Sequence, residues 1–244
     1  HSFVSQSIMS KVVRENGVKV LIGGDGADEL FGGYEFYKKL GSHHDMPDYN
    51  PSAYSGFIDY GVKFDNWKPI SLVQTLRDRW GKYSGYYQFE KDPRERMLQT
   101  VLYSDSVIQL ESAGIRSADA MSLVNSVESR CFYLSNEMLE FALNLPACFK
   151  INLDSKDETI VTKPLLKNAF CRKFGKELLL PKQGFSGYPN EAGRTMIDNN
   201  FPLTRDFLDL TDFPTSNDQI SQALEWKLIN MEFFLGQFKK HIQG

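Results

Sequence analysis

The fold class of this chain is decided by the stretch Val18-Lys19-Val20-Leu21-Ile22-Gly23-Gly24-Asp25-Gly26-Ala27-Asp28-Glu29. Its first five residues are apolar apart from one lysine and rich in β-branched side chains, which predicts a strand buried on both faces of a parallel sheet. A glycine-rich turn follows, and two acidic residues open a helix expected over residues 27–40. Residues 3–15 carry an amphipathic helical pattern that ends before Gly17. Together they predict part of a doubly wound α/β sheet, with the turn at the carboxyl end of the strand.

The rest of the 244-residue chain predicts a mostly helical body. Apolar residues recur at helical spacing in five segments, at residues 70–80, 97–102, 138–145, 165–174 and 220–238. The other strand pattern is weak and lies at residues 149–153. Because a single parallel strand leaves backbone groups without partners, we expect further strands upstream of residue 1. We therefore interpret residues 1–244 as one incomplete domain, with an α/β half at 1–40 and a mainly helical part at 41–244.

Composition and charge exclude several classes of protein. Lys and Arg number 28 against 31 Asp and Glu, a formal net charge of −3, and no long basic run occurs, so a nucleic-acid partner is not expected. No apolar run approaches the ~18 residues that a membrane span needs, so no membrane partner is expected either. The three cysteines form no C-x-x-C pair, which argues against a zinc ribbon, and this low cysteine content favours a reducing compartment. The expected location is therefore cytoplasmic.

The turn Gly23-Gly24-Asp25-Gly26 has the composition of a ligand site. Glycines allow the backbone to approach a ligand closely, and the N–H groups that open the next helix suit a phosphate group. The carboxylates of Asp25, Asp28 and Glu29 would repel a bare phosphate, so a divalent cation such as Mg²⁺ is expected between them. On these residues alone, an ordinary strand-to-helix turn with acidic capping remains an equal alternative.

Residues 21–34, with the sequence L-I-G-G-D-G-A-D-E-L-F-G-G-Y, are similar to the S-G-E-G-x-D-E-x-F-G-G-Y signature of the asparagine synthetase synthase domain. Residues 119–134 resemble the family's D-R-x-S-M-A-x-S-x-E-x-R-x-P-F-L-D block. Residues 163–167 and 180–187 resemble its K-x-x-L-R and P-K-x-G-F blocks, and residues 225–232 resemble its closing helix. The blocks occur in the family's order and cover nearly the whole chain. The resemblance implies an adenine nucleotide alpha hydrolase-like fold with its nucleotide site in the α/β half.

This resemblance implies an ATP-dependent amide ligase. Such enzymes use ATP and Mg²⁺ to adenylate a substrate carboxylate, usually that of aspartate, release pyrophosphate, and let ammonia attack the acyl-adenylate so that AMP leaves. The expected partners are a small-molecule carboxylate and a glutaminase domain, absent from this chain, that supplies ammonia; a homodimer is a possible assembly. The family's upstream S-G-G-x-D-S loop is also absent from the sequence. We therefore expect the C-terminal portion of a longer synthetase, with weak or no ATP turnover by itself.

The family's residue roles carry over position by position. Asp28 matches the acid that binds Mg²⁺ with pyrophosphate, and Lys182 matches a catalytic lysine that contacts the phosphates and stabilises developing charge. Asp25 stands where the family has a catalytic glutamate near the reacting acyl group. Glu128 and Arg130 match the family's E-x-R; because residues two apart do not face each other on a helix, we expect each to meet a different partner. The remaining predicted cofactor-binding residues are Gly23, Gly24, Gly26 and Glu29.

Several departures from the family pattern bear on the substrate. Gly23 replaces a serine, and Asp25 is one methylene shorter than glutamate. Residues 117–120 lack two basic side chains, and residues 130–135 lack a proline and an acid. Two alternatives therefore stay open. One is a divergent amidotransferase that acts on another carboxylate, and the other is a non-catalytic module that keeps the fold.

Overall fold

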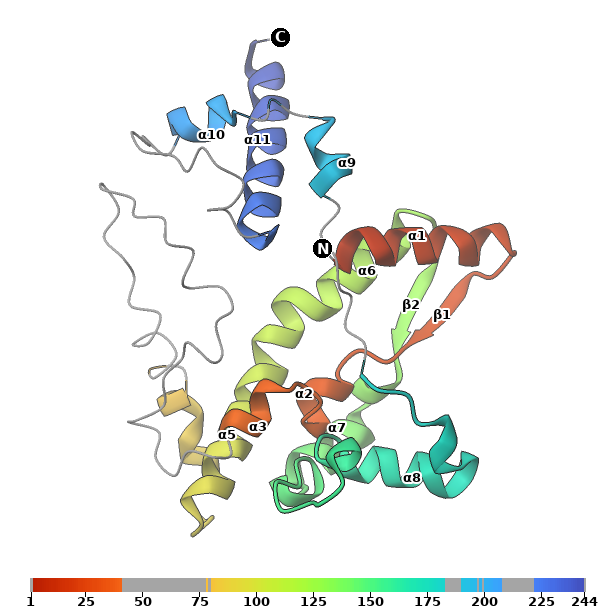
Figure 1. Ribbon diagram of the computed structural model, residues 1–244, viewed down its shortest axis with the longest axis vertical. Helices are drawn as coiled ribbons and strands as arrows, with labels where there is room; N and C mark the ends of the chain where they lie inside the picture. Colours follow the sequence, from red (N-terminus) through yellow and green to blue (C-terminus); the bar gives the residue numbers. More distant parts are fainter. Residues whose placement is uncertain are drawn as a thin grey trace. The chain divides into compact units, whose positions relative to one another are not determined.

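The computed structural model describes residues 2–40, 78, 80–182, 190–196, 198, 200–207 and 222–243, which belong to two compact units (Figure 1). The first unit holds the described residues up to 182, and the second holds those from 190 onward. Each unit is described by itself. The predicted single incomplete domain, divided at residue 40, stays a prediction.

The first unit is mostly helical. In chain order its main elements are α1 (Ser2–Glu15), β1 (Val20–Gly23), α2 (Ala27–Phe31), α3 (Phe36–Leu40), α5 (Pro93–Val107), a π-helical turn (Leu110–Ile115), α6 (Arg116–Leu123), β2 (Glu128–Cys131), α7 (Asn136–Asn144) and α8 (Pro164–Phe174). The predicted helices at residues 3–15, 97–102, 138–145 and 165–174 are confirmed as α1, α5, α7 and α8. Most of the predicted helical segment 70–80 lies outside the described residues.

β1 and β2 form a parallel pair, with Val20 opposite Glu128 and Gly23 opposite Cys131 (Figure 1). The neighbouring strand comes from about a hundred residues downstream, where no strand was predicted. The further strands expected upstream of residue 1 stay a prediction. The sequence of β2, E-S-R-C, carries charge and shows no apolar run, so it gave no strand signal. Within the described part of the chain the sheet has these two strands, which do not by themselves establish a doubly wound sheet.

The burial predicted for β1 is also wrong. Val20 and Ile22 point to one face of the strand pair, and the side chain of Ile22 is 72% exposed. Glu128 and Arg130 lie opposite them in the register and are exposed as well. The apolar sequence of β1 is that of a strand buried on both faces, but among the described residues one face remains open to solvent.

The helix predicted at residues 27–40 is interrupted. α2 ends at Gly32, whose φ of 68° lies in the left-handed region, and the Gly33 N–H donates to the Asp28 carbonyl at 2.8 Å. The chain then passes through Tyr34 and begins again as a helix at Phe36. Two short helices with a break between them therefore replace one long helix.

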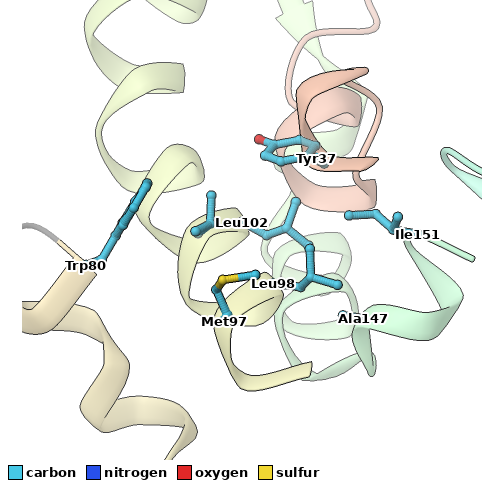
Figure 2. Packing of buried hydrophobic residues seen from close by; sticks show 8 residues of the cluster. Tyr37, Trp80, Met97, Leu98, Leu102, Ala147 and Ile151 are labelled. Carbon is cyan, nitrogen blue, oxygen red and sulfur yellow. The ribbon is translucent and has the colours of Figure 1, made fainter. Parts of the chain in front are cut away.

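Two apolar clusters hold α2 and α3 in place. The larger one joins α3, α5 and the segment after α7 (Figure 2); its buried members are Tyr37, Trp80, Met97, Leu98, Val101, Leu102, Ala147 and Ile151. The smaller one packs Leu30 and Phe31 of α2 against Ala142 of α7. The hydroxyl group of Tyr37 also donates to Asp105 Oδ2 on α5 at 2.7 Å. The core thus fixes both short helices on either side of the break.

The weak strand signal at residues 149–153 corresponds to a short bridge. Ile151 pairs with Thr162 in an isolated antiparallel bridge, and the Asn152 N–H donates to the Val161 carbonyl at 2.8 Å. The Lys163 N–H donates to the Lys150 carbonyl at 3.0 Å. This bridge fixes the backbone immediately before α8.

The second unit contains α9 (Asn190–Arg194), α10 (Pro202–Phe207) and α11 (Gln222–Gln243), so the predicted C-terminal helix is confirmed. The buried carboxylate of Glu232 accepts hydrogen bonds from the N–H groups of Leu203 and Thr204, which open α10. A carboxylate in this position satisfies N–H groups that have no partner within the helix. Among the helices of the described residues, none combines the length and the apolar character that crossing a bilayer requires.

A buried lysine makes the stability of the first unit depend on pH. Lys150 is 2% exposed, and its ammonium donates to Gln99 Oε1 at 2.9 Å. Burial lowers the pKa of Lys150 from 10.5 to about 8, although the Glu95 carboxylate acts in the opposite direction.

We expect the contribution of Lys150 to the free energy of unfolding, measured as the difference between the parent protein and Lys150→Met, to rise between pH 8 and 10.5, because the unfolded chain then holds a proton on Lys150 that the folded chain has released. The rise is at most about 3 kcal/mol. Lys156→Met, at an exposed position, should show the same rise relative to Lys150→Met. Urea unfolding at several pH values measures the parent protein and both variants, and a difference from Lys150→Met that does not change with pH would contradict the assignment.

Candidate functional site

The glycine turn lies at the carboxyl end of β1, as predicted. Gly26 adopts φ 91° and ψ −16°, in the left-handed region, where a side chain would also meet the Leu134 side chain. The Ala27 N–H donates to the Gly24 carbonyl at 3.2 Å and closes the turn. No atom would lie within 4 Å of a Cβ on Gly24, so the predicted glycine turn leaves open space there.

Two lysines converge on Asp28, in the first turn of α2. Asp28 Oδ1 accepts hydrogen bonds from Lys163 Nζ at 2.7 Å and from Lys182 Nζ at 2.8 Å. Asp28 lies on α2, Lys163 immediately precedes α8, and Lys182 lies after α8 in a segment that is neither helix nor strand. The structure therefore brings together two predicted site residues, Asp28 and Lys182, and adds Lys163.

The two lysines determine the charge state of Asp28. Burial by itself would raise the pKa of Asp28, because the charged form loses solvation. The hydrogen bonds and positive charges of Lys163 and Lys182 outweigh that effect and lower the pKa. Asp28 therefore stays ionised at neutral pH in a place that is only 28% exposed. A half-buried carboxylate flanked by two ammonium groups can share a cation with phosphate oxygens while the lysines contact those oxygens.

Gly33 allows this cluster to lie against the backbone. Its carbonyl accepts a hydrogen bond from Lys182 Nζ at 3.0 Å. A Cβ at this position would overlap the carboxylate of Asp28 and would lie 2.8 Å from Lys163 Cε. The second glycine of the G-G-Y segment is thus required by the close approach of Asp28 and Lys163.

Lys163 has an unusual backbone conformation. Its φ of 50° and ψ of 43° lie in the left-handed region, which non-glycine residues rarely adopt. The hydrogen bond from the Lys163 N–H to the Lys150 carbonyl and the next residue, Pro164, hold this conformation. Strain of this kind is concentrated at functional sites. The sequence placed Lys163 only within the K-x-x-L-R block and gave it no role, and that block was the signal that could have identified it.

Asp25 lies in the turn, two residues after the end of β1. Cys131 Sγ, at the end of β2, is 4.0 Å from Asp25 Oδ2. Burial raises the pKa of Asp25, and a hydrogen bond to its own backbone N–H only partly offsets the shift. Burial, and secondarily the charge of Asp25, raise the pKa of the Cys131 thiol. The part of the chain that the structure describes contains no group of three His, Cys, Asp or Glu side chains arranged to hold a metal ion.

Glu29 faces the interior rather than the turn. It is 4% exposed, and Glu29 Oε1 accepts a hydrogen bond from the Tyr34 hydroxyl at 2.6 Å. Burial raises the pKa of Glu29, although the hydrogen bond from Tyr34 acts in the opposite direction. Burial and the charge of Glu29 in turn raise the pKa of Tyr34. The cofactor-binding roles assigned to Glu29, Gly23, Gly24 and Gly26 stay predictions.

Glu128 and Arg130 pair with each other. Arg130 Nε lies 2.8 Å from Glu128 Oε1, on the open face of β2. The expectation that each meets a different partner is wrong, because it assumed a helix. In a strand, residues two apart point to the same face.

Comparison with known proteins places this site in a family. Residues 1–213 match the family described as asparagine synthase. The chain belongs to the asparagine synthase family.

A curated relative is similar to only part of the chain. This protein, Amidase chry2 from Gibberella zeae, is 23% identical over 208 residues, which cover 66% of this chain and 31% of the relative. The chain thus spans about a third of that relative's length. No solved structure gives a significant match.

We expect Gly33→Ala to destabilise the protein by about 1–3 kcal/mol, because the added methyl group displaces Asp28 and Lys163. Gly81→Ala is the matched control: it is an exposed helical position where no atom would lie within 4 Å of the new Cβ. That variant should be unchanged or more stable by roughly 0.5–1 kcal/mol. Urea unfolding compares the two. Equal stability of Gly33→Ala and the parent protein would refute the close approach.

Removing both lysines should reverse the direction of the pKa shift of Asp28. Either Lys163→Met or Lys182→Met should raise the pKa of Asp28 from its depressed value. In the double variant burial acts without compensation, so the pKa should exceed the ordinary value of 3.8. NMR titration of the Asp28 carboxyl carbon measures each step. A pKa that stays low in the double variant would mean that other groups stabilise the charge.

Proposed function

We propose that the protein is an ATP-dependent amide ligase that adenylates a carboxylate and transfers ammonia to it. In the first step a carboxylate oxygen of the substrate attacks the α-phosphorus of ATP, and the bond to the β-phosphate breaks to release pyrophosphate. In the second step ammonia attacks the acyl carbon, loses a proton, and AMP leaves. The observation that carries this proposal is the convergence of Lys163 and Lys182 on Asp28 beside the family's glycine turn.

The charges of this cluster suit a magnesium–pyrophosphate group. Mg²⁺ is commonly held by one or two carboxylates together with phosphate oxygens, so a single aspartate suffices. We assign the magnesium contact to Asp28, and contacts with phosphoryl oxygens to Lys163 and Lys182. When bound, the ion would neutralise charge on the leaving pyrophosphate. The ammonium groups act on the same charge as fixed point charges that need no rearrangement during the reaction.

We assign the acyl side of the site to Asp25. It lies at the end of β1, and burial raises its pKa, as is common for carboxyl groups that take part in proton transfer. Gly23, Gly24 and Gly26 would then line the passage between the acyl group and the phosphates. The open space beside Gly24 accords with that role.

The identity of the acid and the source of ammonia extend this proposal. The altered segments at residues 117–120 and 130–135 favour a carboxylate other than aspartate, as in a divergent amidotransferase. We propose that ammonia comes from a glutaminase domain outside residues 1–244, and that the active assembly is a homodimer.

Pyrophosphate release from ATP across a panel of carboxylic acids, measured on the complete natural protein, tests the proposal. Asp28→Ala and Lys182→Ala should each reduce the rate by about 100-fold or more, because each removes a charge that acts on the transition state. Lys156→Ala, at an exposed position outside the cluster, should leave the rate unchanged. Full activity in both site variants would exclude the assignment. A folded protein that releases no pyrophosphate with any acid would favour the non-catalytic alternative.

A further inference from the structure

Side-chain contacts fix the position of the Lys182 ammonium. Lys182 belongs to neither a helix nor a strand, so secondary structure does not hold its side chain. Its Nζ contacts Asp28 Oδ1 at 2.8 Å and the Gly33 carbonyl at 3.0 Å. It also lies over the ring of Tyr34, 4.6 Å from the ring centroid. An ammonium at this distance is attracted to the face of the ring.

The Tyr34 ring is itself held on two sides. It stacks on the ring of Phe36, with the ring centroids 5.4 Å apart and the ring planes at 13°. Its centroid also lies 5.7 Å from that of the Tyr37 ring. Its hydroxyl group donates to Glu29 Oε1 at 2.6 Å. These contacts leave the ring little freedom to turn, so it is a rigid surface for the lysine.

Glu29 joins this surface to the helix that carries Asp28. Consecutive residues of a helix point about 100° apart, so Asp28 can face the lysines while Glu29 faces the interior. The hydrogen bond from Tyr34, which lies in the break between α2 and α3, ties that segment to Glu29 on α2. Because Glu29 is 4% exposed, a ligand in the turn would not reach its carboxylate directly, and its influence passes through Tyr34.

We propose that Tyr34, anchored by Glu29, is a positioning residue that orients Lys182 toward Asp28 and the phosphoryl oxygens. An ammonium has three N–H donors. Asp28 and the Gly33 carbonyl take two of them, and the ring covers one side of the group, so one donor remains for a ligand oxygen in a fixed direction. This inference rests on the proposed function for the identity of the ligand, but the platform made by Tyr34 and Glu29 can be tested without it.

The first test measures the contact between Lys182 and the Tyr34 ring. In protein labelled with ¹³C-lysine, the ε-methylene signal of Lys182, assigned with Lys182→Arg, should lie upfield because of the Tyr34 ring current. Tyr34→Phe keeps the ring and should retain most of the shift, whereas Tyr34→Leu should abolish it while circular dichroism shows a folded protein. Tyr83→Leu is the matched control, since Lys82 lies over that ring at 5.3 Å and only the Lys82 signal should move. An unshifted Lys182 signal in the parent protein, or one unaffected by Tyr34→Leu, overturns the proposal.

The second test asks whether the platform serves the ligand. Calorimetric titration with inorganic pyrophosphate and Mg²⁺ should show about tenfold weaker binding in Tyr34→Leu and much less loss in Tyr34→Phe. Glu29→Leu removes the same hydrogen bond as Tyr34→Phe and should weaken binding to a similar small extent, whereas Glu29→Gln, which keeps an acceptor for Tyr34, should bind like the parent protein. If the parent protein binds no pyrophosphate, the proposed function fails while the NMR result still decides the platform. Unchanged pyrophosphate affinity in Tyr34→Leu would overturn the positioning role.

Discussion

A carboxylate that is partly removed from water loses solvation of its charge, and at Asp28 two lysines compensate for that loss. Burial acts to protonate this group, and the ammonium groups of Lys163 and Lys182 outweigh it. Each partner depends on a separate part of the fold. The glycine turn and α2 determine the position of Asp28. The bridge at Ile151 and Thr162 fixes the backbone that carries Lys163, and the break after α2 provides the Gly33 carbonyl that Lys182 contacts.

The hydrophobic core packs against the helices that carry this arrangement rather than against the strand pair. The clusters around α5 and α7 clamp the two short helices on either side of the break. Tyr37 links them further through its hydrogen bond to Asp105. The strand pair, in contrast, is small and half exposed, and its contribution is to deliver the turn to the site.

Much of the local structure could be predicted from sequence because it depends on short-range chemistry. The periodicity of α1, the strand after it and the glycine turn are all local patterns. β2 was missed because its residues alternate charge with small polar groups and its partner is distant in the chain. Lys163 was missed because its partner Asp28 is likewise distant in the chain, and the inward direction of Glu29 was missed because it depends on how α2 packs. Only the three-dimensional packing shows which of two neighbouring acids faces solvent and which lysine faces the acid.

The open face of β1 has a consequence for the behaviour of the isolated polypeptide in solution. Val20 and Ile22 present β-branched side chains to water on a strand whose sequence suits a sheet interior. Exposed strands of this composition are prone to aggregation, because other strands can pair with their edges and cover their faces. At high concentration the chain by itself is therefore prone to self-association. A covering polypeptide on that face would act as a solubility factor as well as a structural neighbour.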